Sequence, residues 1–110
     1  MTHTLNDWCR IADENARAKG FTHDTVKAIA LMHQELSELL EAHRTDPEAY
    51  CGKEMPNGDR LPLTMEAEEC ADIFLRLANY CGARGIDLDR AVDLKHLYNT
   101  TRPHRHGKRF

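Results

Sequence analysis

Two stretches of this 110-residue sequence repeat one pattern of side-chain types thirty-four positions apart. Residues 35–40 (ELSELL) and residues 69–74 (ECADIF) each read acid, apolar, small, acid, apolar, apolar. On a helix, acids three positions apart project from one side on successive turns, beside a stripe formed by the apolar residues. If two such helices pack antiparallel through those stripes, four carboxylates converge at the edge of one core: Glu35, Glu38, Glu69 and Asp72.

A cluster of four carboxylates repels itself unless a cation neutralises it. Ligands that are all oxygen suit a hard divalent ion, so the pattern predicts a site for Mg²⁺, with Mn²⁺ as the other candidate. A single helix carboxylate is usually a solvated surface residue, and this simpler interpretation stays open for each of the four. No Glu has a His three positions later, so we do not expect a di-iron site.

A second set of polar residues lies near the end of the chain. Lys95, Asn99 and Arg102 are offset by four and seven positions, which places them on one face of a helix or just beyond its end. An ammonium, an amide and a planar guanidinium all suit phosphate oxygens. The alternative is a basic helix C-terminus that only complements the helix dipole.

Charge is distributed unevenly along the chain, although the net charge is only −3. Residues 35–72 hold eleven acids and three bases, whereas residues 95–110 hold five bases and no acid. Metal ligands in the middle of the chain and anion-binding groups at its end are what a phosphate substrate would need. A solvated acidic face and a loose basic tail would give the same asymmetry.

Four helices must position these residues, and the sequence predicts one all-α domain over residues 1–110. We expect helices at about residues 5–19, 24–43, 65–83 and 87–99, with capping residues before each and Gly20 and Gly85 after the first and third. Apolar spacing predicts that the second helix buries Val26, Ile29, Leu36, Leu39 and Leu40. It predicts that the fourth buries Leu88, Ala91, Val92 and either Leu94 or Leu97.

A long polar connection and a basic tail complete the expected domain. Residues 45–63 carry three prolines and an Asn-Gly turn signal, so they read as a loop between the second and third helices. A connection of this length in a compact domain is more often functional than idle. The last residues, 102–110, look extended and basic.

Composition argues against several classes of protein. The four cysteines lack the Cys-x-x-Cys spacing of structural zinc sites. The N-terminus does not resemble a signal peptide, and the longest strictly apolar run has five residues (28–32), so we expect a cytoplasmic protein with no membrane partner. The basic tail has no interleaved aromatic residues, so we do not expect nucleic acid as a partner.

Together these motifs resemble those of the MazG-like all-α nucleoside triphosphate pyrophosphohydrolases. The resemblance covers about residues 24–108 and rests on four motifs: Glu35-x-x-Glu38, Glu69-x-x-Asp72, Lys95-x-x-x-Asn99-x-x-Arg102 and His106-Gly107-Lys108. The sequence departs from the family in two respects. The stretch between the two acid pairs is somewhat longer than the family leads us to expect, and Gln34 stands where many members have a further Glu.

The resemblance implies a four-helix MazG-like bundle that hydrolyses nucleoside triphosphates, non-canonical or deoxy forms included, to a nucleoside monophosphate and pyrophosphate. The four acids would hold Mg²⁺, and Glu38 or Glu35 would orient or deprotonate the attacking water. Lys95, Asn99, Arg102 and Lys108 would bind the substrate phosphates. The resemblance also implies a homodimer or homotetramer with sites near subunit contacts.

Base recognition and the identity of the reaction leave alternatives. Trp8 could stack on a nucleobase, although aromatic residues are more often part of the core. Asn15 interrupts an apolar stripe, so its amide needs a partner, which could be a base edge or a backbone carbonyl. A phosphoribosyl-ATP pyrophosphohydrolase has a similar fold and acid pattern. A non-enzymatic helical module for oligomerisation or nucleotide sensing is the third interpretation.

Overall fold

The structure is a computed structural model that describes residues 2–102. Four helices occupy most of this range: α1 (Leu5–Ala18), α2 (Thr25–Thr45), α3 (Met65–Arg84) and α4 (Leu88–Thr100). Residues 2–102 contain no β-strand beyond isolated bridges. The predicted all-α fold is confirmed, and each helix begins and ends within two residues of its expected limits.

Local signals in the sequence account for these limits. The side chains of Thr4, Asp24, Thr64 and Asp87 each accept a hydrogen bond from a backbone N–H in the first turn of the helix that follows. Such caps satisfy donors that have no partner inside the helix. Gly85 ends α3 in the left-handed conformation with φ 68°, which glycine adopts without steric cost.

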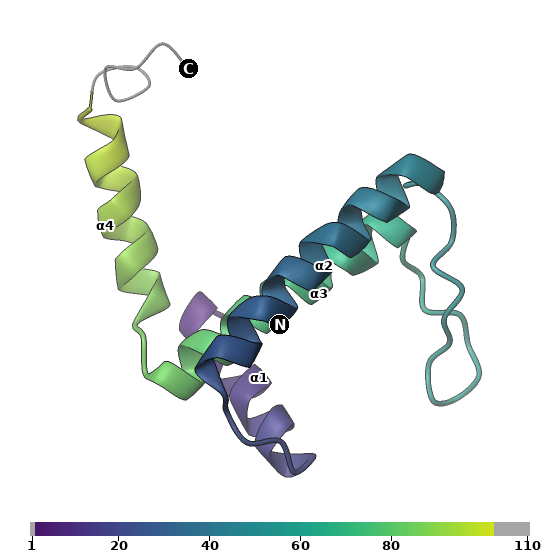
Figure 1. The fold of residues 1–110 in the computed structure, drawn as a ribbon, viewed down its shortest axis with the longest axis horizontal. Helices are drawn as coiled ribbons and strands as arrows, with labels where there is room; N and C mark the ends of the chain where they lie inside the picture. Colours follow the sequence, from purple (N-terminus) through teal and green to yellow (C-terminus); the bar gives the residue numbers. More distant parts are fainter. Residues whose placement is uncertain (1, 103–110) are drawn as a thin grey trace.

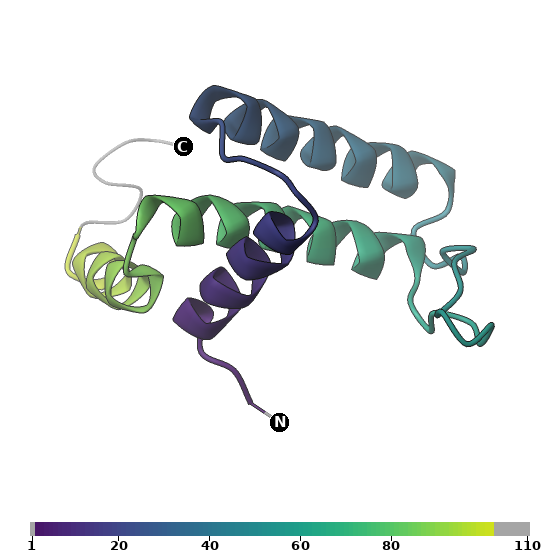
Figure 2. The ribbon, with the colours of Figure 1, turned by 90° about the horizontal axis from the view of Figure 1, so that it is seen from below.

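The helices are arranged around α3. In Figures 1 and 2, α2 and α3 run antiparallel beside each other, α1 crosses α3, and α4 projects away to one side. The crossing of α1 and α3 is close, because a Cβ atom at Gly82 would lie 2.2 Å from the carbonyl oxygen of Cys9. The small buried core lies at this crossing and consists of Cys9, Ala78 and Cys81.

The N-terminal ends of α1 and α4 cap each other. The Asp89 carboxylate accepts hydrogen bonds from the backbone N–H groups of Leu5 and Asn6, at 3.2 and 3.1 Å. In return, Oδ1 of Asn6 accepts from the backbone N–H groups of Leu88 and Asp89, at 2.8 and 3.2 Å. These bonds fix the start of α4 against α1.

The apolar residues of α2 do not face where the sequence led us to expect. Leu36 and Leu40 are 51% and 50% exposed, whereas Glu35 is 6% exposed and Ala42 is buried. The expectation was wrong because α2 turns the face that carries Glu35 and Ala42 toward α3. The stripe that includes Leu36 and Leu40 is therefore left without a partner in the described chain.

On α4, Leu88 is partly buried against the core as expected, but the expected burial is wrong for the rest of its apolar face. Val92, Leu94 and Leu97 are exposed because only the start of α4 packs against α1. Among the described residues, fourteen large apolar side chains are exposed. Exposed apolar surface on this scale is typical of proteins that associate. In residues 2–102 there is no helix whose length and apolarity would let it cross a bilayer.

Candidate metal centre

Three of the four predicted acids come together between α2 and α3. Glu35 of α2 and Glu69 and Asp72 of α3 each place a carboxylate oxygen within 4.8 Å of the other two. Glu35 is 6% exposed, and Glu69 and Asp72 are half-buried. The helical spacing predicted this convergence. The carboxylates lie between the two helices, rather than at the margin of a core built from the Leu36 stripe.

Two oxygens of this cluster lack partners. Oε1 of Glu35 accepts a hydrogen bond from Nε of Arg76 at 3.2 Å. Within the described part of the chain, Oε2 of Glu35 and Oε2 of Glu69 are buried and accept no hydrogen bond. Buried polar atoms in native proteins are almost always satisfied, so an orphaned pair of carboxylate oxygens at one point indicates a missing partner. A cation would satisfy both oxygens and would also neutralise their charge.

Burial and neighbouring negative charges raise the pKa values of three acids at this site. Burial, followed by the charges of Glu38 and Asp72, raises the pKa of Glu69 above its ordinary 4.5. Burial, followed by the charge of Glu35, raises the pKa of Asp72 above its ordinary 3.8. A hydrogen bond with Glu35 and the charge of that residue raise the pKa of Glu38. Glu38, the fourth predicted acid, is therefore adjacent to the cluster on the α2 side.

The donor set fits the ion that the sequence predicts. Three converging carboxylates supply only oxygen ligands, which suits Mg²⁺ or Mn²⁺ rather than zinc or a soft metal. Mg²⁺ keeps several waters and often binds through a few carboxylates together with substrate phosphates. A set of three carboxylates with Glu38 at its edge therefore matches a site that shares its ion with a phosphate ligand.

Two cationic side chains border the cluster, and neither was predicted from the sequence. Arg76 reaches Glu35 from α3, and Nζ of Lys53 lies 2.6 Å from Oε1 of Glu68. Glu68 is 8% exposed. Arg76 follows Asp72 by four positions, so helical periodicity could have placed it on the acid face. Lys53 lies in the connecting segment, where no periodicity applies.

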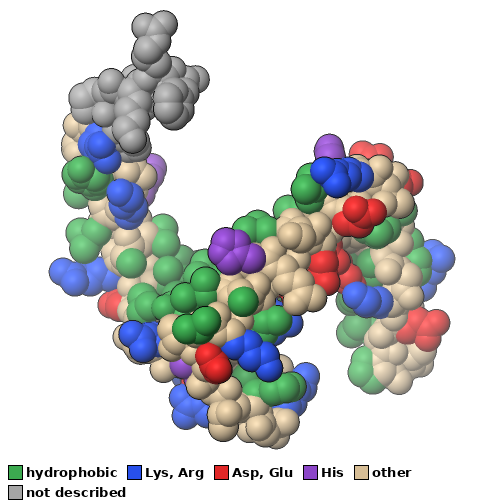
Figure 3. Space-filling view, in the orientation of Figure 1, with side chains coloured by type: hydrophobic (Ala, Val, Ile, Leu, Met, Phe, Trp, Pro, Cys, Tyr) green, Lys and Arg blue, Asp and Glu red, His purple; other side chains and the backbone are tan. Residues whose placement is uncertain are grey.

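The predicted phosphate-binding residues do not join the acids within one chain. Lys95 and Arg102 lie over the Tyr98 ring, at 4.7 and 5.0 Å from its centroid, and Asn99 is exposed on the same helix. Figure 3 shows Lys and Arg side chains along α4, apart from the acidic side chains over α2 and α3. The predicted Lys108 lies outside the described residues, together with its neighbours His106 and Gly107.

The two candidate base-binding residues both lie on α1. Trp8 is partly exposed and meets the His3 ring edge-on, with 4.9 Å between ring centroids. Asn15 is exposed, so solvent can satisfy its amide and no partner within the chain is needed. Both residues belong to the helix that crosses α3, rather than to the α2–α3 pair that carries the acids.

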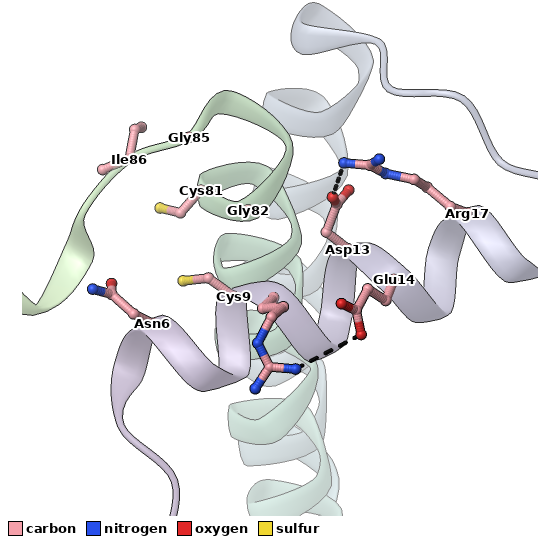
Figure 4. A pocket seen from close by; sticks show the side chains of 10 residues that line it. Asn6, Cys9, Asp13, Glu14, Arg17, Cys81, Gly82, Gly85 and Ile86 are labelled. Atoms are coloured by element: carbon pink, nitrogen blue, oxygen red, sulfur yellow. Dashed lines mark hydrogen bonds and ion pairs between the residues drawn. The ribbon is translucent and has the colours of Figure 1, made fainter.

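A hollow of about 360 Å³ lies between α1 and the C-terminal end of α3, and it is distinct from the acid cluster (Figure 4). Asn6, Cys9, Asp13 and Gly82 contribute to its lining. Its buried carboxylate, Asp13, is paired with the guanidinium of Arg17, as the dashed line in Figure 4 marks. This charge is therefore already neutralised, whereas Oε2 of Glu35 and Oε2 of Glu69 have no partner in the described chain.

Comparison with protein-family models, with curated proteins and with solved structures finds no match for this chain. The candidate metal centre is therefore interpreted from the residues and geometry of the chain itself.

Proposed function

We propose that this chain is a Mg²⁺-dependent pyrophosphohydrolase that converts nucleoside triphosphates to nucleoside monophosphates and pyrophosphate. The observation that carries the proposal is the acid cluster, in which buried oxygens of Glu35 and Glu69 have no hydrogen-bond partner in the described chain. The matched acid pairs and the basic set on α4 are the motifs that resemble the MazG-like family, and they support the same reaction.

Glu35, Glu69 and Asp72 would hold the ion. When bound, Mg²⁺ neutralises phosphate oxygens and lowers the pKa of water. Glu38 is the proposed general base, because it is an exposed carboxylate that interacts with Glu35 and Glu69 at the edge of the cluster. Arg76 donates to Glu35 and so holds that carboxylate in place.

The proposed reaction breaks one phosphoanhydride bond. The water oxygen forms a bond to the α-phosphorus while Glu38 takes the proton. The bond from the α-phosphorus to its bridging oxygen breaks, and the electron pair leaves with pyrophosphate. Cationic side chains are needed where this leaving charge develops.

We further propose that the protein works as a cytoplasmic homodimer or homotetramer. The exposed apolar side chains of α2 and α4 support self-association. The basic face of α4 supports it as well, because Lys95, Asn99 and Arg102 would reach an acid cluster if α4 of one copy packed beside α2 and α3 of another. The same exposed surface would also suit a non-enzymatic oligomerisation module, so activity has to be measured.

The direct test is pyrophosphate release from a panel of nucleoside triphosphates and phosphoribosyl-ATP, with and without Mg²⁺. We expect Mg²⁺-dependent release from at least one nucleoside triphosphate. Asp72→Asn should abolish it while leaving helical content unchanged, and Glu41→Gln, which alters an exposed acid of α2, should leave turnover intact. Release from phosphoribosyl-ATP alone, or wild-type turnover in Asp72→Asn, would contradict the proposal.

A further inference from the structure

The segment that joins α2 to α3 brings a lysine to the acid cluster. Nζ of Lys53 lies 2.6 Å from Oε1 of Glu68, which is buried at the start of α3. The negative charges of Glu68, Asp72 and Glu69 raise the pKa of Lys53 in that order, after its hydrogen bond to Glu68. The ammonium therefore lies on the α3 side of the cluster, while its side chain is 60% exposed and open to a ligand.

The backbone around Lys53 is held in place. Its carbonyl oxygen accepts a hydrogen bond from the backbone N–H of Leu61 at 2.8 Å and another from the Tyr50 hydroxyl. Isolated antiparallel bridges pair Tyr50 with Thr64 and residue 54 with residue 60. These bonds order the segment around Lys53 and so fix the backbone from which its ammonium reaches Glu68.

The position of Lys53 relative to Glu38 suggests a specific role. In-line displacement at a phosphorus places the attacking and leaving oxygens on opposite sides. Glu38, the proposed base, interacts with Glu35 and Glu69, whereas Lys53 is bonded to Glu68 and its charge acts on Asp72. An exposed cation that is bonded to an acid other than the base would be available to the charge that leaves with pyrophosphate.

We propose that Lys53 binds the outer phosphates of the substrate and stabilises the leaving pyrophosphate, an inference that rests on the proposed pyrophosphohydrolase activity. An ammonium has three donors, so Lys53 keeps its bond to Glu68 and offers another to a phosphate oxygen. Glu68 positions the ammonium and does not bind the metal. The chain thereby supplies a phosphate-binding cation from its own connecting segment, in addition to the basic residues of α4.

The test compares kcat and KM of the full chain for a Mg²⁺–nucleoside triphosphate that wild type hydrolyses. Lys53→Met should lower kcat/KM by about 10- to 100-fold, since it removes a hydrogen bond between charged groups. It should also weaken competitive inhibition by free pyrophosphate. Lys53→Arg should restore most of both effects. Lys27→Met, which removes an exposed lysine of α2, is the matched control and should behave as wild type.

Two outcomes would overturn the inference, and they can be told apart. If wild type releases pyrophosphate and Lys53→Met matches Lys27→Met, the Lys53 inference alone is wrong. The inference is also wrong if Glu68→Gln reproduces every effect of Lys53→Met, because the lysine then only tethers the segment to α3. If wild type hydrolyses none of the nucleotides, the proposed function fails and the inference fails with it.

Discussion

Replacing Glu69 by Gln should stabilise the metal-free protein and weaken its response to metal. The substitution removes one negative charge from the acid cluster and replaces a carboxylate oxygen with an amide that can donate to its neighbours. A residue that only supported the fold would lose stability on substitution. Here we expect the substitution to raise stability, because Glu69 has a raised pKa and a buried oxygen without a partner in the described chain.

The magnitude follows from the spacing of the carboxylates. Oxygens of the three acids lie within 4.8 Å of one another, where two unit charges repel by about 3 kcal/mol at an effective dielectric constant of ~20. Glu69 and Asp72 are only half-buried, so solvent screening reduces the relief to about 1 kcal/mol. For a domain of this size, that corresponds to a rise in Tm of about 4 °C.

Metal binding should have the larger effect in wild type. An ion present at a hundred times its Kd stabilises the native state by about 2.7 kcal/mol, or roughly 10 °C in Tm. Thermal unfolding followed by circular dichroism, with EDTA or with Mn²⁺, measures both quantities. Glu69→Gln should melt higher than wild type in EDTA and gain less than wild type from Mn²⁺.

The matched control is Glu41→Gln, which removes the same charge from an exposed position on α2. It should change neither the Tm in EDTA nor the shift with Mn²⁺ by more than about 2 °C, since surface substitutions stay within ~0.5 kcal/mol. The reasoning is refuted if Glu69→Gln melts lower than wild type in EDTA, or if it gains as much from Mn²⁺ as wild type does.

Two further predictions concern pH and the helix crossing. Because the pKa values of Glu69 and Asp72 are raised, the native state binds protons more tightly than the unfolded chain. The Tm in EDTA should therefore rise as the pH falls from neutral toward 4.5, the ordinary pKa of Glu69, while the apparent Mn²⁺ affinity falls. A flat Tm and affinity over that range would contradict this prediction. Gly82→Ala should lower the Tm by about 4–12 °C, since its Cβ would meet the Cys9 carbonyl oxygen at 2.2 Å and such overpacking costs about 1–3 kcal/mol. An unchanged melting curve for Gly82→Ala would show that α1 can move away without cost.

The helices and the meeting of the acids could be predicted because both depend on local rules. Capping residues such as Thr64 and the left-handed Gly85 mark helix ends through contacts only a few residues away. Helical periodicity also puts Glu69 and Asp72 on one side of α3 whatever packs against it. Once α2 and α3 lie antiparallel, Glu35 faces this pair.

The packing face of α2 could not be predicted, because the helix carries apolar residues on more than one side. Leu36 and Leu40 form one stripe, and Leu31 and Leu39 lie on another that is half-buried. Hydrophobic periodicity does not show which of two such stripes packs against the neighbouring helix. The placement of α4 depends on hydrogen bonds between Asn6 and residues more than 80 positions later. Local sequence patterns do not predict contacts between residues so far apart in the chain.

The central claim is that the carboxylates of α2 and α3 share a divalent cation. The most direct measurement is the anomalous diffraction of Mn²⁺ in crystals of the full chain grown with that ion. We expect an anomalous peak at bonding distance from carboxylate oxygens of Glu35, Glu69 and Asp72. Mn²⁺ bound only elsewhere, with these three carboxylates free of metal in every subunit, would contradict the claim.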